Sequence, residues 1–236
     1  TIRFFNGEFR YSVTDLSSGG QGLPWGHTRY YSNQRYRGTA RVNEDIGQGT
    51  NWFVDNWPYI TDQMEDGSVV VVSFSQEQSV FFNRTGSDYT PTNGAENRYS
   101  LVVDSGSHLF RMTDPRGIVW EFQDFTSPSG PPGRFYRATL AGGQQIAVTS
   151  YSDDSLGEVE RTYTQDSITY TEKYTYSYAS GQLASVTVQR RVGAGAYANV
   201  ERANYTYYGS SEANGNLGDL KTVTGQRWDG SGWEDH

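Results

Sequence analysis

Residues 168–178 read Ile168-Thr-Tyr170-Thr-Glu172-Lys-Tyr174-Thr-Tyr176-Ser-Tyr178, with large side chains at even positions and Thr, Lys or Ser between them. This alternation has the period of two that is typical of a β-strand. A helix is disfavoured because β-branched and aromatic residues lose side-chain freedom against the preceding helical turn. Gly181 then marks a turn, and residues 183–190 form a second strand-like run. The segment therefore predicts a β-hairpin.

The rest of the chain has a composition that favours strands and turns. Its 236 residues include 18 Tyr and 27 Gly but only 2 Met. Aromatic and β-branched side chains suit a pleated, half-buried surface. Further strands are predicted at residues 4–13, 52–60, 69–74, 99–103, 109–113, 118–122, 135–140, 145–151, 158–163, 197–207 and 220–228. We therefore expect an all-β fold of antiparallel hairpins, stacked into a sheet that curves through its own twist.

Charge, hydropathy and cysteine content argue against several kinds of partner. The chain has 27 acidic and 19 basic residues, a formal net charge of -8, and its arginines are scattered among acids. A nucleic-acid-binding protein needs a basic footprint, and none is visible. No apolar run approaches the roughly 20 residues that span a bilayer. There is no Cys for a disulfide or a thiolate metal site. We expect no nucleic-acid partner, no membrane span and no cofactor.

The three histidines give little support for catalysis or metal binding. His27, His108 and His236 are far apart in the sequence, and no Gly-x-Ser-x-Gly motif accompanies them. Their spacing matches no metal-ligand pattern such as His-x-x-x-His. We interpret them as turn or surface residues.

Paired carboxylates are the other candidate catalysts, because a glycosidase needs two acids that flank the scissile bond. The candidate pairs are Asp153 with Asp154, Glu158 with Glu160, and Glu44 with Asp45. Acids in turns are usually solvated, and neighbouring acids on a strand point to opposite faces. We therefore predict that the chain is not an enzyme and has no catalytic, metal-binding or cofactor-binding residues.

Two segments of the C-terminal half are internal repeats. Both follow the pattern Tyr-x-Tyr, a turn, then Gly-x-Leu-x-x-Val-Thr. The shared positions are Tyr176, Tyr178, Gly181 and Leu183 in the first copy, and Tyr205, Tyr207, Gly218 and Leu220 in the second. Each copy predicts one hairpin, with Gly where the turn needs conformational freedom. A single hairpin cannot bury its own apolar face, so we expect the copies to stack.

These patterns resemble the YD repeats of Rhs proteins. A divergent copy is Thr113-Asp114-Pro-Arg-Gly117, followed by Trp120 and Phe122. The opening segments Asn6-Gly-Glu-Phe9, Val13-Thr-Asp15-Leu16 and Gly22-Leu23-Pro24 are similar to the region that precedes the repeats in that family. The resemblance implies that residues 1–126 form an Rhs-like cap or start of the sheet, and that residues 127–236 form YD-repeat hairpins.

The same resemblance implies a structural function. Such sheets spiral into hollow shells that enclose a C-terminal effector, or serve as scaffolds that are secreted or displayed on the bacterial cell surface. The two clear repeats and two degenerate ones, of which the second spans residues 133–151, are too few to close a shell. We therefore expect further YD-repeat segments or other chains to pair along the edges of the sheet. An encapsulated C-terminal effector is a further expected partner.

The aromatic residues permit an alternative function. Rigid rings with a polar edge make platforms for sugars, so the chain could be a carbohydrate-binding β module that holds glycans. Trp228 and Trp233 lie in a Gly-rich terminal segment and are the candidate ligand-binding pair. Under the structural interpretation, the aromatic residues are instead the core of the repeat sheet.

Overall fold

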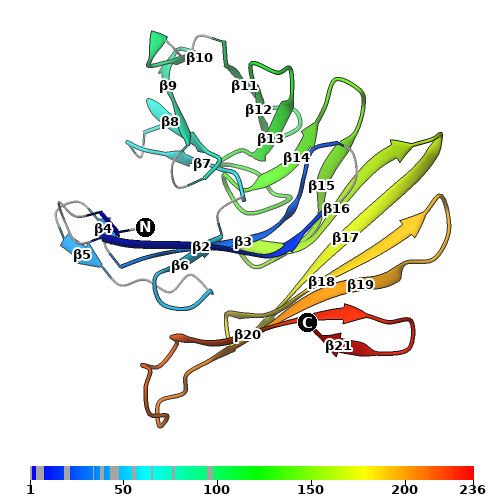
Figure 1. Cartoon of the computed structure of the whole chain (residues 1–236). Helices are drawn as coiled ribbons and strands as arrows, with labels where there is room; N and C mark the ends of the chain where they lie inside the picture. The colour runs from blue at the N-terminus through cyan, green and yellow to red at the C-terminus, as the bar shows by residue number, and fades with distance from the viewer. Residues whose placement is uncertain are drawn as a thin grey trace. The chain divides into compact units, whose positions relative to one another are not determined.

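The computed structural model describes residues 2–3, 8–18, 22–33, 35–37, 40–42, 48–54, 57–64, 66–75, 78–94 and 98–236. Over these residues the chain has no α-helix, and its sheets are mostly antiparallel (Figure 1). The all-β, antiparallel prediction is therefore confirmed. In this part of the chain no helix has the length and apolar character needed to cross a lipid bilayer.

Twenty-one strands are labelled in chain order. They are β1 (Ile2–Arg3), β2 (Glu8–Ser17), β3 (Gly26–Ser32), β4 (Arg35–Arg37), β5 (Ala40–Val42), β6 (Trp52–Val54), β7 (Tyr59–Asp62), β8 (Val69–Ser73), β9 (Ser79–Thr85), β10 (Asp88–Pro91), β11 (Ser100–Asp104), β12 (Leu109–Thr113), β13 (Val119–Gln123), β14 (Phe135–Thr139), β15 (Gln145–Ser152), β16 (Ser155–Gln165), β17 (Ile168–Ala179), β18 (Gln182–Val192), β19 (Ala198–Tyr207), β20 (Leu220–Trp228) and β21 (Trp233–Asp235). Strands β7 to β21 follow one another in a single hydrogen-bonded order, while β1, β2, β3 and β6 form a second sheet and β4 and β5 a third. Sequential neighbours pair along the large sheet, as expected for a series of hairpins.

The chain divides into two compact units, which we describe separately. Unit 1 comprises Thr1–Gly19, Pro24–Asp55 and Glu172–His236. Unit 2 comprises Gly20–Leu23 and Asn56–Thr171. Unit 1 therefore joins segments from both ends of the sequence.

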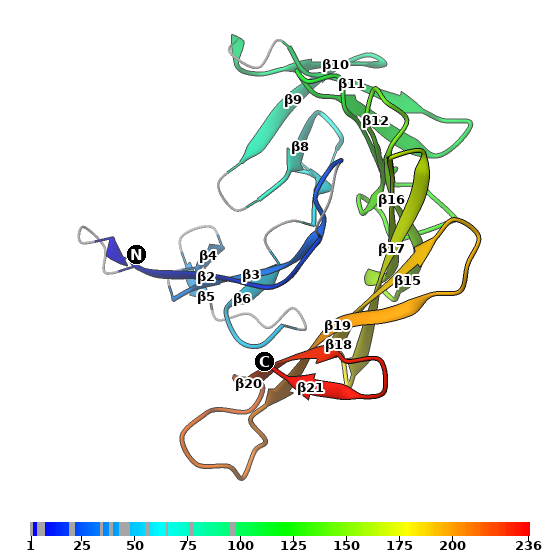
Figure 2. The same ribbon diagram turned by 45° about the vertical axis from the view of Figure 1, so that its right-hand side comes forward.

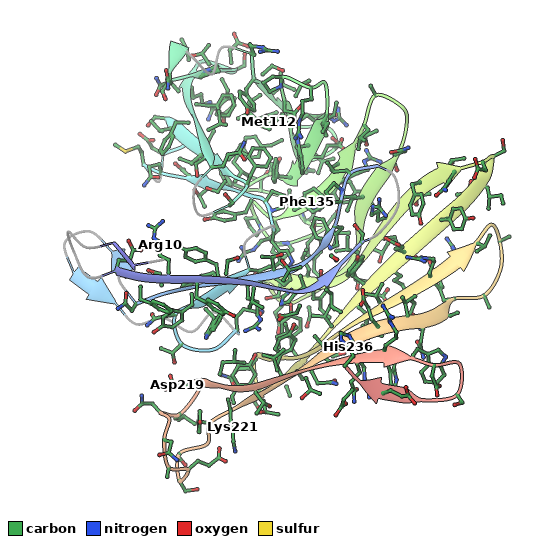
Figure 3. All side chains as sticks on the ribbon, viewed as in Figure 1. Arg10, Met112, Phe135, Asp219, Lys221 and His236 are labelled. Atoms are coloured by element: carbon green, nitrogen blue, oxygen red, sulfur yellow. The ribbon has the colours of Figure 1, made fainter. Side chains whose placement is uncertain are left out.

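The core of unit 2 consists of side chains from successive hairpins. In β15, Ile146 and Val148 are buried and Ala147 between them is not, which is the alternation of a strand with one apolar face. Residues with at most 1% exposure are Val70, Val72, Phe82, Met112, Phe122, Phe135, Ala138, Ile146 and Val159. Figure 3 labels Met112 and Phe135 within this group. Burying a large apolar side chain contributes about 1.5–3 kcal/mol, so these residues hold the hairpins together.

Gly133 fixes the start of β14 against β7. Its φ of 73° lies in the left-handed region, and its peptide oxygen accepts a hydrogen bond from the Ile60 N–H at 2.8 Å. A Cβ atom at this position would lie 2.1 Å from the Ile60 carbonyl oxygen. Only glycine can therefore occupy the site without moving backbone.

Gly133→Ala is expected to lower the free energy of unfolding by more than about 2 kcal/mol, because backbone strain and a collision with a carbonyl act together. The matched control is Gly143→Ala. Gly143 has a similar φ of 79°, but a Cβ there meets nothing within 4 Å. That variant should lose only about 1 kcal/mol from the conformational cost. Urea denaturation measures both, and equal losses would contradict the steric explanation.

Unit 1 contains the predicted hairpin of residues 168–190 from Glu172 onward. Strands β17 and β18 are joined by Ser180 and Gly181, which both have positive φ, as a type I′ turn requires. Tyr174 and Tyr176 of β17 are buried, whereas Thr175 and Ser177 are not. The period-two interpretation is therefore confirmed from Glu172 to Tyr178, but not at the start of the strand, where Ile168 is exposed and Thr171 is buried.

The second sheet of unit 1 packs on the tyrosines of β17. Strands β2 and β3 run antiparallel to each other (Figure 2). Just before β3, the Trp25 side chain donates a hydrogen bond through Nε1 to the Tyr176 hydroxyl at 3.1 Å. The Tyr174 hydroxyl donates to the Trp25 carbonyl oxygen at 3.2 Å. Unit 1 is thus built from two sheet layers with aromatic residues between them.

One strand prediction is wrong and another falls partly outside the described residues. The predicted strand 52–60 is two strands: β6 pairs with β3, and β7 pairs with β8 in a different sheet. Pro58 lies between them and has no N–H to contribute to a continuous ladder. Of the predicted strand 4–13, residues 4–7 are not described and residues 8–13 belong to β2.

Candidate functional site

The first predicted repeat forms the β17–β18 hairpin. Tyr176 is buried, and Tyr178 near the end of the strand is half-buried. Gly181 has a φ of 80° in the turn, as predicted from its need for conformational freedom. Leu183 on the return strand is fully buried. Tyr176 and Leu183 therefore pack in the interior of unit 1.

The second predicted repeat forms the β19–β20 hairpin, and it contacts the first. Tyr205 is buried, and Tyr207 pairs with Leu220 across the two strands. Gly218, at a φ of 84°, donates its N–H to the Tyr208 carbonyl oxygen at 3.0 Å. The Tyr207 hydroxyl donates to the Leu183 carbonyl oxygen at 2.8 Å. The second tyrosine of one copy is therefore hydrogen-bonded to the backbone at the leucine position of the other copy.

Trp228 and Trp233, the candidate glycan platform, are direct partners across β20 and β21. Their ring centroids are 5.3 Å apart at an interplanar angle of 70°. The Arg202 guanidinium lies 4.4 Å from the centroid of the Trp233 ring. Both indoles are half-buried. One face of Trp233 is therefore occupied by Arg202, which leaves less of it for a stacked sugar.

Asp114 shows how the acids of the turn motifs are used. Its carboxylate accepts the N–H of Arg116 at 2.8 Å and the N–H of Ile118 at 3.0 Å. Burial opposes the charged form, but these bonds and the Arg116 guanidinium hold the pKa of Asp114 below its usual value. The Thr-Asp-x-x-Gly motif therefore closes a hairpin.

The other candidate catalysts are dispersed. Asp153 and Asp154 are exposed in the turn between β15 and β16, and Glu44 and Asp45 lie outside the described residues. His108 lies in a turn at a φ of 56° with a partly exposed side chain, as predicted. In the described part of the chain, no group of three or more His, Asp or Glu side chains is placed to hold a metal ion.

The most unusual polar group in unit 1 is a buried ion pair between Asp15 and Arg29. Arg29 donates to the Asp15 carboxylate through Nε, and through Nη2 at 2.9 Å. The side chains are only 3% and 5% exposed. The Tyr205 hydroxyl donates to Asp15 Oδ2 at 2.8 Å. The guanidinium carbon lies 4.6 Å from the Trp52 ring centroid and 5.2 Å from that of Tyr205.

A β-bulge brings Asp15 to Arg29. The register changes from Thr14 opposite Thr28 to Leu16 opposite His27, so Asp15 is the extra residue. Such bulges redirect side chains, often next to functional sites. Burial alone would lower the pKa of Arg29, but the hydrogen bond and charge of Asp15 raise it above its usual value. Burial and the Asp15 charge also raise the pKa of Tyr205, which stays a hydroxyl donor.

His27 was predicted to be a turn or surface residue, and that prediction is wrong. It lies in β3 with 0% exposure. Its ring centroid is 6.0 Å from that of Tyr176 and 5.7 Å from that of Tyr205. Burial, with a contribution from Arg29, lowers the pKa of His27 to about 4, although Asp15 acts in the opposite direction. At neutral pH the imidazole is therefore uncharged.

Asp15 and Arg29 line an open groove of about 360 Å³ within unit 1. Strands β2, β3 and β6 form one wall, and strands β19 and β20 form the other. The lining residues are Tyr11, Val13, Asp15, Arg29, Trp52, Ala203, Leu220, Val223 and Gly225. The walls are therefore largely aromatic and aliphatic, with one ion pair among them.

The groove exists because two small residues are neighbours. Ala203 and Gly225 are direct partners across β19 and β20, and partners in a sheet point to the same face. A Cβ atom built on Gly225 would have His236 Cε1 as its nearest neighbour, at 3.3 Å. Figure 3 shows His236 at the end of the chain beside β20. Larger residues at these two positions would fill the space.

No protein-family model matches the sequence, and a search of curated proteins gives no match. Proposals about the function of this chain therefore depend on its residues and their arrangement.

Proposed function

We propose that the chain is a non-catalytic structural segment, a scaffold or part of an encapsulating shell, of an extracellular Rhs/YD-type repeat protein. Two hairpins that share the Tyr-x-Tyr and Gly-x-Leu positions support this proposal. They lie next to each other in the strand order, and Tyr207 of one donates to the Leu183 carbonyl of the other. Their aromatic residues pack between sheet layers, as a stacked repeat requires.

The observation that carries the proposal is an open strand edge in unit 1. Strand β20 pairs with β19 along most of its length, but β21 pairs only with residues 226–228. Within the described part of the chain, residues 220–224 therefore have a ladder partner on one side only, while the Gly225 carbonyl oxygen accepts a hydrogen bond from the His236 N–H at 3.1 Å. Lys221, Thr222 and Val223 are exposed along this stretch. An unpaired edge is a template for another strand. Its partners would be further repeat segments or other chains.

Blocking this edge should reduce self-association. We expect the purified chain to show a weight-average mass that rises with concentration, and Thr222→Lys to reduce the rise, since charges on edge strands oppose pairing. The matched control is Asn83→Lys. Asn83 is also exposed, but it lies on β9 with Val69 of β8 opposite it on one side and Thr90 of β10 on the other. Light scattering after gel filtration measures the effect, and the control should associate like the parent chain.

The same experiment distinguishes the carbohydrate-binding alternative. A compact monomer at all concentrations would contradict the scaffold proposal. Suppose that the elution volume and mass of that monomer also changed when one soluble polysaccharide was added, and that Trp228→Ala removed this change. Glycan binding would then replace the scaffold proposal.

A further inference from the structure

The two repeat copies agree beyond the turn and the leucine that define them. After the shared Gly-x-Leu-x-x-Val-Thr, both continue with x-Gln-Arg-x-x-Gly-x-Gly at the same spacing, without insertion or deletion. These added positions are Gln189, Arg190, Gly193 and Gly195 in the first copy, and Gln226, Arg227, Gly230 and Gly232 in the second. Gly193 and Gly230 both have positive φ, at 55° and 105°. Strand β20 with the turn after it is therefore the counterpart of strand β18 with its own turn.

Strand β18 of the first copy is covered by β19. Its residues from Ser185 to Arg190 pair with β19. Closer to the start of β18, the Tyr207 hydroxyl donates to the Leu183 carbonyl oxygen at 2.8 Å. Leu183 and Val186 are both 0% exposed. The Tyr-x-Tyr segment of one copy therefore covers the Gly-x-Leu-x-x-Val strand of the copy before it.

Strand β20 of the second copy has only the beginning of such a cover. Strand β21 pairs with residues 226–228, and within the described part of the chain no strand pairs with residues 220–224 on this side. Val223 is 37% exposed, whereas its counterpart Val186 is 0% exposed. A further strand would pair the open edge and bury this apolar side chain. The position on β20 that corresponds to the Tyr-x-Tyr segment on β18 is therefore open.

The groove of unit 1 lies on the face where the rings of such a segment would point. Partners across a ladder point to the same face of the sheet, and Val223 lines the groove. In the first copy, Ala203 faces Val186, and Tyr205 and Tyr207 follow it at intervals of two residues. Side chains at that interval share one face of a strand. The same segment on β20 would therefore place both tyrosines on the face that lines the groove, toward its aromatic wall.

We propose that the β20 edge and the groove beside it form one binding site for an antiparallel strand that carries Tyr-x-Tyr, supplied by a further copy of the same repeat. This strand continues the ladder of β21 past Gly225 and pairs with residues 221–224. A second copy of this chain cannot supply it without losing pairing of its own, because β17 and β19, its two Tyr-x-Tyr strands, have neighbours on both sides. The inference rests on the proposed scaffold function and adds the identity of the partner strand.

The test supplies the segment in line with β21. Gly225 is the counterpart of Val188, which faces Glu201, and the Gly225 carbonyl oxygen accepts the His236 N–H at 3.1 Å. His236 therefore takes the place of Glu201, and Arg-Ala-Asn-Tyr-Thr-Tyr, the sequence of residues 202–207, continues the register when it is fused after His236. The matched control is the same extension with Ser in place of both Tyr residues. Neither extension replaces a residue of the parent chain, so the fold is kept.

Amide hydrogen exchange is measured for the parent chain and both extended chains at a concentration where all three are monomeric. We expect the Tyr extension to slow the exchange of those amides of residues 220–224 that do not bond to β19 by at least about tenfold. The Ser extension should leave them close to the parent rates, since it buries no aromatic ring. Amides of β12, which has a neighbour on both sides, should exchange equally in all three proteins.

The outcomes separate this inference from the scaffold proposal. Equal slowing by the Tyr and Ser extensions would overturn the Tyr-x-Tyr assignment, because any strand would then satisfy the edge, and the scaffold proposal would stand. Parent rates in both extended chains would overturn the site itself. The dependence of the parent chain's mass on concentration decides the scaffold proposal separately, because this experiment uses monomers only.

Discussion

Asp15→Ala is expected to lower the free energy of unfolding by about 3–5 kcal/mol, the usual effect of removing one partner of a buried ion pair. Arg29 would keep its charge at 3% exposure with no carboxylate beside it. The Tyr205 hydroxyl would lose its acceptor as well. Urea denaturation followed by tryptophan fluorescence measures the change, since Trp25 and Trp52 both belong to this unit.

Two further variants show whether the loss comes from the uncompensated charge. Asp104→Ala removes one carboxylate partner of Arg111, at 2.6 Å. These side chains are 34% and 39% exposed, and Glu121 still pairs with Arg111, so the effect should be much smaller than that of Asp15→Ala. In Asp15→Leu combined with Arg29→Met, both charges are gone, and most of the stability should return. An equal loss in Asp15→Ala and in the double variant would mean that packing dominates.

The sequence predicts a strand correctly where large and small side chains alternate within that strand. Alternation between Tyr170 and Tyr178 identifies β17, and Gly181 identifies the turn after it. The strand β3 was missed because its pattern is not alternating: His27, Arg29 and Tyr30 are all buried. A strand covered on both faces has no period of two, and charged residues within it look like surface residues.

The groove could not be predicted because it depends on pairing between distant strands. Asp15 reaches Arg29 only through a β-bulge, and the sequence contains no mark of the extra residue. Ala203 and Gly225 leave a hollow only because they are partners across β19 and β20. Small residues are common in strands and turns, so each taken alone predicts nothing. Tyr174, Tyr176 and Tyr205 are buried, as expected of aromatic residues, whose large apolar area favours burial in any register.

Lowering the pH from 7.5 to 5 should destabilise unit 1 through His27. The folded state lowers the pKa of His27 from 6.5 to about 4. Above pH 6.5 both states hold a neutral imidazole, so the shift has no effect there. Between pH 6.5 and pH 4 the unfolded state binds a proton at His27 that the folded state does not bind. The free energy of unfolding therefore decreases as the pH is lowered. At pH 5 the difference amounts to about 2 kcal/mol.

The measurement compares urea unfolding at pH 7.5 and pH 5 in three proteins. His27→Phe keeps an aromatic ring against Tyr176 and Tyr205 but cannot bind a proton, so most of the pH dependence should disappear. His108→Gln alters a turn residue whose side chain is exposed, and this variant should keep the pH dependence of the parent chain. Burial raises the pKa of Glu201, so this residue makes the folded state more stable as the pH falls. Its contribution is the same in all three proteins and cancels in the comparison. An equal fall in the parent and in His27→Phe would mean that another group carries the acid sensitivity.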